Sequence, residues 1–543
     1  MASSAVAVPE LRDETARDEK MPAGIPFIIS NEFAERFCFY GINSILTVYM
    51  VQYLHFTDSR GAAWQSLFKS GAYFFPLVGA IVSDVFWGKF KTIVIFSLLY
   101  VAGCVALALS GHTEAALASS LMLVALGTGG IKPCVSTNVG DQFTAKNQHL
   151  IERAFSWFYL AINAGSLISI ALCPVLLQKP GFGPKWAFGM PAVMMLVATA
   201  VFVTGRAKFA VVPPAGKAWL SDVFSKEGVK LILSLLVVYF FVACFWMLWD
   251  QSNGNTWTLQ AQSSLMDKNV GFGLTLLPAQ VQVVNGFFIL LLAPGFSYLV
   301  YPFFERFFKV TPLRKIGAGL FVTASSFVII AWIEKQIQSG HSVSVWWQIF
   351  AYLVMTAGEV LVSITALEFS YKQAPLRVKS FIMALFLLSI SFGNLMIAAV
   401  NHAMVRPVHA QSMEVGAQTW VKIAEADIFV TGQKIDFTGN VGVQYLKADG
   451  KLQPLEGTFL VSAVDNASHR VQLMDVVQRK PIESSGAYTA GGEVSTYWLV
   501  GPAYFYFFIA VMLVVSVIFI FVAMAYKEKT HVRTDSGGQP SPG

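Results

Sequence analysis

Charged residues are scarce in this sequence. Asp, Glu, Lys and Arg make up 13% of the 543 residues, whereas apolar residues make up 55% and the mean hydropathy is +0.58. A soluble globular domain has about 25% charged residues, so this composition excludes an ordinary soluble protein. It indicates a protein that crosses a membrane many times.

Cysteines, buried histidines and enzyme motifs are also scarce or missing. The five cysteines, at positions 38, 104, 134, 173 and 244, all fall in apolar stretches, so we expect neither a disulfide framework nor a metal cluster. None of the eight histidines lies deep in such a stretch, which argues against a histidine proton relay. We find no nucleophile elbow, phosphate loop or triad pattern and therefore expect no enzyme, metal or cofactor. The net charge of +6 gives no reason to expect nucleic acid as a partner.

Apolar stretches long enough to cross about 30 Å of hydrocarbon recur along the chain. We predict twelve spans, at residues 26–53, 62–86, 91–110, 115–139, 150–177, 185–206, 230–250, 275–303, 312–334, 343–371, 376–404 and 497–526. The sequence thus predicts an all-α membrane protein with two six-helix bundles.

The remaining residues divide these bundles into segments. We predict an N-terminal tail at 1–25, a first bundle at 26–206, a linker at 207–229, helices 7–11 at 230–404, a β-rich insert at 405–496, the last helix at 497–526 and a disordered tail at 527–543. Within the insert, strands are expected at residues 428–430, 441–446, 458–461 and 470–474.

The distribution of Lys and Arg predicts the orientation of the spans. Only Arg60, Lys69, Lys179, Lys185, Lys268 and Lys335 are assigned to short loops on the outer side. We therefore expect both termini in the cytoplasm and the insert outside, in a bacterial inner membrane or a eukaryotic plasma membrane.

Ionisable residues interrupt the first span. Glu32, Glu35, Arg36, Tyr40 and Asn43 have the spacing of one helical stripe, which must face protein or water. Charges inside a bilayer usually mark a substrate or proton pathway. A buried ion pair that only fixes helix packing is the alternative, but one Glu–Arg pair would suffice for that.

Several motifs resemble those of the proton-dependent oligopeptide transporters of the major facilitator superfamily. Residues 32–41 (EFAERFCFYG) resemble the first-helix signature, 127–134 and 140–143 the fourth-helix region, 158–167 the fifth-helix signature and 358–371 the tenth helix. The resemblance implies a monomeric, alternating-access symporter that moves di- and tripeptides together with protons across the lipid bilayer. Peptide-like drugs are further candidate substrates.

A zwitterionic peptide needs fixed charges of both signs in its site. We expect Arg36 and Lys132 to attract the peptide carboxylate, and Glu359, helped by Asn163 and Asn285, to receive its ammonium group. The resemblance adds further substrate-binding residues, namely Tyr40, Tyr73, Tyr159, Trp246, Trp249, Ser363 and Phe386. The residues expected to couple protons are Glu32, Glu35, Arg36, Lys132 and Asp250. For Asp250 a role as a helix-end cap remains an equal alternative.

Two positions depart from the family pattern. Asn43 stands where the family usually has a second arginine, so positive charge is missing there. Ser66 stands where animal members have a histidine thought to relay protons.

Two other functions stay open at the level of sequence. One is a carrier of nitrate or another small solute within the same family, although an anion needs no counterpart of Glu359. The other is a membrane-anchored receptor or partner-docking protein, although an anchor gains nothing from charges in its spans.

Overall fold

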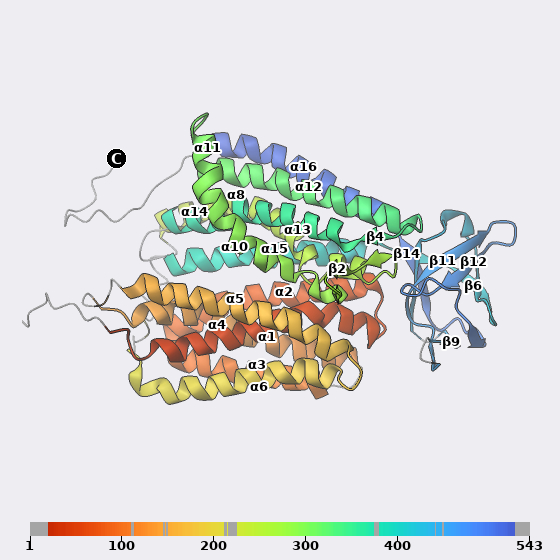
Figure 1. The fold of residues 1–543 in the computed structure, drawn as a ribbon, viewed down its shortest axis with the longest axis horizontal. Coiled ribbons are helices and arrows are strands. Elements are labelled where there is room, and N and C mark those ends of the chain that lie inside the picture. The colour runs from red at the N-terminus through yellow and green to blue at the C-terminus, as the bar shows by residue number, and fades with distance from the viewer. Residues whose placement is uncertain are drawn as a thin grey trace, which may run out of the picture.

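The computed structural model describes residues 20–109, 113–144, 147, 150–210, 214, 225–373, 379–439, 441–447 and 450–526. Its long helices lie roughly parallel, and a β-rich domain sits at one end of them (Figure 1). The first helix begins and the last helix ends at the opposite end of the bundle. The predicted tail at 527–543 and most of the predicted linker lie outside the described residues.

The N-terminal half contains six long helices. They are α1 (Ile25–Gln52), α2 (Asp58–Ile81) continued by the π-helical η1 (Val82–Trp87), α3 (Lys89–Leu109), α4 (Glu114–Asp141), α5 (Ile151–Gln178) and α6 (Pro184–Thr204) with the 3-10 turn η3 (Gly205–Lys208). Threonines cap two of these helices, because Thr57 accepts from the backbone of Arg60 and Thr113 from that of Ala116.

The C-terminal half is more segmented. Its helices are α8 (Lys226–Ser252), α9 (Thr256–Ala261), α10 (Val283–Gly295), α11 (Tyr301–Glu305), α12 (Pro312–Gln338), α13 (Val345–Glu359), α14 (Thr365–Gln373), α15 (Lys379–Ala403) and α16 (Pro502–Ala525). Shorter elements between them are β1 (Met266–Asp267), β2 (Asn269–Gly271), β3 (Leu274–Thr275), η4 (Pro278–Gln280), η5 (Phe296–Val300), β4 (Val343–Ser344) and η6 (Val360–Ile364).

Eleven helical segments among the described residues are long and apolar enough to cross a membrane. The twelfth long helix, α1, has 28 residues and carries the charged residues Glu32, Glu35 and Arg36. The predicted all-α membrane architecture is therefore confirmed. Each half has its own hydrophobic core, with Tyr49 and Tyr100 in the first and Trp257 and Phe327 in the second.

The glycine-rich part of α4 explains how a lysine comes to lie between helices. A Cβ on Gly129 would lie 2.4 Å from the Cβ of Phe75, and one on Gly130 would lie 2.1 Å from the Phe96 ring. Small residues let membrane helices approach this closely. The two glycines thus let α4 pack closely against α2 and α3, and Lys132 lies two residues after Gly130.

The β-rich domain lies between α15 and α16. Its strands are β5 (Val405–Val408), β6 (Ala410–Glu414), β7 (Trp420–Ile423), β8 (Lys434–Thr438), β9 (Val443–Leu446), β10 (Leu452–Pro454), β11 (Gly457–Asp465), β12 (Arg470–Met474), β13 (Ser484–Gly486) and β14 (Glu493–Tyr497). They form a seven-stranded antiparallel sheet in the order β5-β14-β8-β11-β12-β7-β6 and a three-stranded sheet in the order β10-β9-β13. Phe437 and Phe459 pack in its core.

One predicted strand of this domain is wrong. Ile428 ends the 3-10 turn η7 (Ala426–Ile428), and residues 428–430 form no strand, although Phe429 is buried in the domain core. A short apolar run marks burial but does not by itself distinguish a strand from a buried turn. The other three predicted runs overlap β9, β11 and β12.

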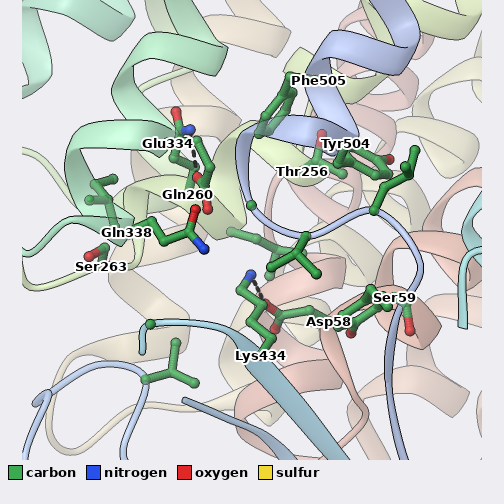
Figure 2. Close-up of a pocket in the computed structure, with 18 of the residues that line it drawn as sticks. Asp58, Ser59, Thr256, Gln260, Ser263, Glu334, Gln338, Lys434, Tyr504 and Phe505 are labelled. Carbon is green, nitrogen blue, oxygen red and sulfur yellow. Dashed lines mark hydrogen bonds and ion pairs between the residues drawn. The ribbon is translucent and has the colours of Figure 1, made fainter. Parts of the chain in front are cut away.

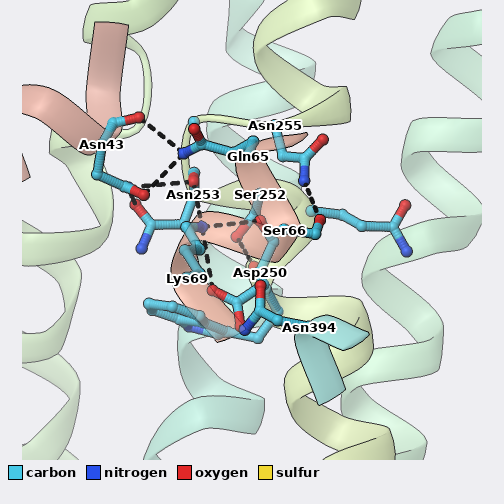
Figure 3. A network of polar contacts seen from close by, with 12 residues as sticks. Asn43, Gln65, Ser66, Lys69, Asp250, Ser252, Asn253, Asn255 and Asn394 are labelled. Carbon is cyan, nitrogen blue, oxygen red and sulfur yellow. Dashed lines mark hydrogen bonds and ion pairs between the residues drawn. The ribbon is translucent and has the colours of Figure 1, made fainter. Parts of the chain in front are cut away.

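A buried ion pair joins the two halves (Figure 3). Lys69 Nζ on α2 lies 3.0 Å from Asp250 Oδ1 on α8, and both side chains are almost fully buried. Lys69 also donates to the carbonyl oxygen of Asn253 at 2.6 Å, and Asn394 of α15 donates to the other oxygen of Asp250. Our assignment of Lys69 to an outer loop is therefore wrong, because its charge is neutralised inside the bundle by a helix of the other half.

Amide groups extend this contact toward the β-rich domain. Gln65 Nε2 donates to Asn43 Oδ1 at 2.7 Å, and Asn43 Nδ2 donates to Asn253 Oδ1 at 3.1 Å. Asn255 Nδ2 donates to Ser66 Oγ at 2.9 Å. We call the set Asn43, Gln65, Ser66, Lys69, Asp250, Asn253, Asn255 and Asn394 the inter-half network. It holds the two halves together at the end that carries the β-rich domain.

Removing one charge of the central pair should destabilise the protein more than removing both. Lys69→Met or Asp250→Asn alone leaves a buried charge without its partner, and we expect each to lower the free energy of unfolding by about 3 kcal/mol. The double variant should lose clearly less free energy of unfolding than the two single variants lose together. Unfolding in detergent, followed by tryptophan fluorescence, measures this difference, and additive losses would contradict a coupled pair.

Candidate functional site

The charges of α1 form a compact cluster. Arg36 Nε lies 2.6 Å from Glu32 Oε1 and 3.2 Å from Glu35 Oε2. Both glutamates are buried, whereas the Arg36 side chain keeps 15% of its surface exposed. Thr128 of α4 donates a hydrogen bond to the other oxygen of Glu35. One guanidinium is therefore shared by two carboxylates, as the spacing of the helical stripe predicts.

Lys132 of α4 lies close to this cluster and contacts aromatic rings. Its Nζ is 3.7 Å from the centre of the Phe39 ring and 4.2 Å from that of Tyr73. Although Lys132 is buried, its ammonium group has no hydrogen-bond partner among the described residues. Ring faces attract a cation but do not replace the hydrogen bonds that water would give it. The position suits a ligand that brings an anionic oxygen.

Glu359, at the end of α13, is a carboxylate and therefore has the opposite charge to Lys132. One oxygen of its carboxylate accepts from Trp249 Nε1 and from Asn285 Nδ2, both at 2.8 Å. Within the described part of the chain no cation lies within ion-pair distance of this carboxylate. The π-helical turn η6, which contains Ser363, follows directly, and such turns are frequent at functional sites. A negative charge held by neutral donors alone suits a cationic ligand.

Two tyrosines of the N-terminal half lie near charged groups of both halves. Tyr40 is near enough to Arg36 and to Glu359 to interact electrostatically with both. Tyr73, beneath Lys132, is similarly near Asp250. Trp246 packs edge-on against Trp249, with ring centres 5.1 Å apart. Aromatic side chains thus lie around and between the positive and the negative group.

Three predicted site residues make their described contacts elsewhere. Asn163 Nδ2 donates to the carbonyl oxygen of Tyr159 in its own helix, and Tyr159 is half exposed. Phe386 packs against Tyr239 in the core of the C-terminal half, with ring centres 6.1 Å apart. Of the two asparagines expected beside Glu359, the structure places only Asn285 in contact with it.

The sequence analysis missed most of the inter-half network. Asp250, which the sequence predicts either to couple protons or to cap its helix, forms an ion pair with Lys69. Lys69 falls inside the predicted span 62–86, so the argument applied to Arg36 and Lys132 could have found it. Asn43 belongs to the same network, where an uncharged side chain bonds both Gln65 and Asn253.

Comparisons with known proteins agree with the motifs. The model of the POT family matches residues 90–226 and 217–421. Solute carrier family 15 member 2 of Danio rerio is 35% identical over 362 residues, which are 58% of this chain and 50% of the relative. The chain thus spans about half the length of the curated relatives it matches.

Solved structures extend the comparison. The in meso crystal structure of the POT family transporter PepTSo is 33% identical, with a TM-score of 0.65 over 71% of this chain and 90% of that one. A structure described as an auto-inhibited POT family peptide transporter is 26% identical, with a TM-score of 0.69 over 94% of this chain and 99% of that one. With the family model covering more than half of its residues, this chain belongs to the POT family.

Proposed function

We propose that this protein is a proton-coupled symporter of di- and tripeptides that works by alternating access. The observation that carries the proposal is the pair of half-sites, in which Lys132 lacks a hydrogen-bond partner among the described residues and Glu359 is held by neutral donors. A peptide carboxylate near Lys132 and Arg36 would supply the missing partner of Lys132. The peptide ammonium group near Glu359 would supply a charged partner for that carboxylate. The similar solved structure that is described as an auto-inhibited POT family peptide transporter supports this substrate class.

Binding across the halves would couple occupancy to closure. Lys132 belongs to the N-terminal half and Glu359 to the C-terminal half, so one bound peptide would draw the halves together around itself. We further propose that both termini lie in the cytoplasm, that the β-rich domain lies outside and that the monomer suffices for transport.

Proton coupling would follow from competition for Arg36. In this structure the guanidinium serves both Glu32 and Glu35. A peptide carboxylate that approaches Arg36 would weaken one of these contacts. A buried carboxylate that loses its counter-charge takes up a proton more readily, so peptide and proton would bind together.

The first test is uptake of a labelled dipeptide into liposomes that contain the purified protein. An inward proton gradient should drive accumulation, and a protonophore should abolish it. Nitrate flux without dipeptide uptake would instead support the alternative carrier, and no flux of either would favour a docking protein.

Replacing Glu359 should distinguish peptides by their N-terminus. Glu359→Gln keeps the shape but removes the charge, so affinity for free dipeptides should fall by roughly 10- to 100-fold. N-acetylated dipeptides should change by less than about twofold. Competition for labelled-peptide uptake measures both, with Glu305→Gln at the exposed end of α11 as the matched control. Equal losses for free and acetylated peptides would refute the assigned role.

Replacing Lys132 should distinguish peptides by their C-terminus. Lys132→Met preserves the apolar contacts with Phe39 and Tyr73 but removes the cation. We expect affinity for dipeptides with a free carboxylate to fall by roughly 10-fold or more, while C-terminally amidated dipeptides change little. The same competition assay measures this, and a variant that retains the preference for a free carboxylate would contradict the proposal.

Removing a carboxylate of the α1 cluster should separate peptide movement from the proton gradient. Glu35→Gln should lose most gradient-driven accumulation, because the site can no longer exchange one proton in each cycle. Exchange of labelled for unlabelled peptide at equal pH should persist within about threefold. Unchanged accumulation in the variant would show that Glu35 does not couple protons.

A further inference from the structure

The β-rich domain contacts the N-terminal half, although its chain emerges from the C-terminal half. Lys434 Nζ on β8 lies 2.6 Å from Asp58 Oδ2 at the start of α2. The backbone N–H of Asp58 donates to Thr458 Oγ1 on β11 at 2.8 Å. Figure 2 shows the Lys434–Asp58 contact beside the cavity at this boundary. The domain therefore bridges the two halves.

The residues that make this bridge are held in place within the domain. Thr458 Oγ1 donates to Asp436 Oδ1 at 2.7 Å, and Tyr497 donates its hydroxyl to Asp436 Oδ2 at 2.6 Å. Burial raises the pKa of Asp436 to about 7. Burial alone would lower the pKa of Lys434, but the carboxylates of Asp58, Glu334 and Asp436 together outweigh burial and hold that pKa above its usual range. Lys434 is therefore charged at neutral pH, with Asp58 as its ion-pair partner.

The same domain is fixed firmly to the C-terminal half. It is joined to α15 and α16 at its two ends, and it also touches the end of α12. A Cβ on Gly432 would lie 2.7 Å from the carbonyl oxygen of Gln338. Gly432 has a positive φ of 82°. The domain should therefore move with the C-terminal half.

Its contact with the N-terminal half includes the polar bonds to Asp58. Beside them a cavity of about 130 Å³ lies between α2, the helices of the C-terminal half and the domain, lined both by polar residues such as Asp58 and Lys434 and by apolar residues such as Ala62, Ile337 and Leu460. The ion pair between Lys434 and Asp58 therefore lies at the edge of a cavity and not inside a continuously packed core.

We propose that the β-rich domain is a latch that holds the bundle closed at this end. The latch acts in addition to the inter-half network, and opening of this end must break the Lys434–Asp58 and Thr458–Asp58 contacts. The proposal rests on the alternating access proposed above. Weakening the latch should increase the share of molecules that are open at this end.

The test is a distance measurement across this end by pulsed electron paramagnetic resonance, with the full chain in lipid nanodiscs. One spin label goes on Ala115→Cys at the start of α4, and the other on Ser339→Cys just after α12. Both positions are exposed, whereas the five native cysteines are buried. The two labels report separation of the halves whether or not any substrate is transported.

Lys434→Gln should raise the population with long distances by roughly tenfold, the factor expected from loss of one charge-assisted hydrogen bond. Thr458→Val, which removes the acceptor for the Asp58 backbone, should act in the same direction. Lys422→Gln is the matched control, because Lys422 is exposed on β7 of the same domain, and it should leave the distances unchanged.

The double variant Lys69→Met/Asp250→Asn removes the ion pair of the inter-half network, and its label distances are the reference for molecules in which that network is weakened. If it lengthens the distances while Lys434→Gln and Thr458→Val do not, the latch is refuted and alternating access stands. An equal shift in Lys422→Gln would also refute the latch. If no variant alters the distances, both the latch and the proposed alternating access are overturned.

Discussion

The structure depends on pairing buried charges between helices that come from different parts of the chain. A charge in a low-dielectric bundle is stable only when an opposite charge or several hydrogen bonds surround it. Lys69 and Asp250 satisfy this requirement for each other, and their contact fixes α2 against α8. Arg36 satisfies it within α1 for two glutamates. Lys132 has no hydrogen-bond partner among the described residues, and Glu359 has only neutral donors. For that reason these two are the proposed binding groups.

This contrast divides the buried charges by role. A pair that is complete in the absence of a ligand can hold the two halves together, as Lys69 and Asp250 do. A charge with incomplete partners gains most from a ligand of opposite sign, which is the case for Lys132 beside its aromatic rings and for Glu359 among neutral donors. Arg36 lies between these cases, since its partial exposure and two carboxylate partners allow a third anion to compete.

Individual charges could be predicted from the sequence, but the pairs that cross the halves could not. Glu32, Glu35 and Arg36 share a helix, so their spacing alone predicts their contact. Lys69 and Asp250 are 181 positions apart, and only the packing of α2 against the C-terminal half brings them together. Among the amides of the inter-half network, Asn43 belongs to the polar stripe of the first span, but its partners Gln65 and Asn253 lie in other parts of the chain and could not be predicted from spacing. In the apolar run at 428–430 only Phe429 is buried, and Val430 is exposed, so the run of apolar residues did not predict a strand.

In the proposed mode of binding, charges from opposite halves hold one peptide at both of its ends. A structure of the full chain with a bound dipeptide would show whether they do. We expect the peptide carboxylate within about 4 Å of Lys132 or Arg36 and the ammonium group at the same range from Glu359, the distance typical of ion pairs. A dipeptide bound in the reverse orientation, or in contact with only one half, would contradict it.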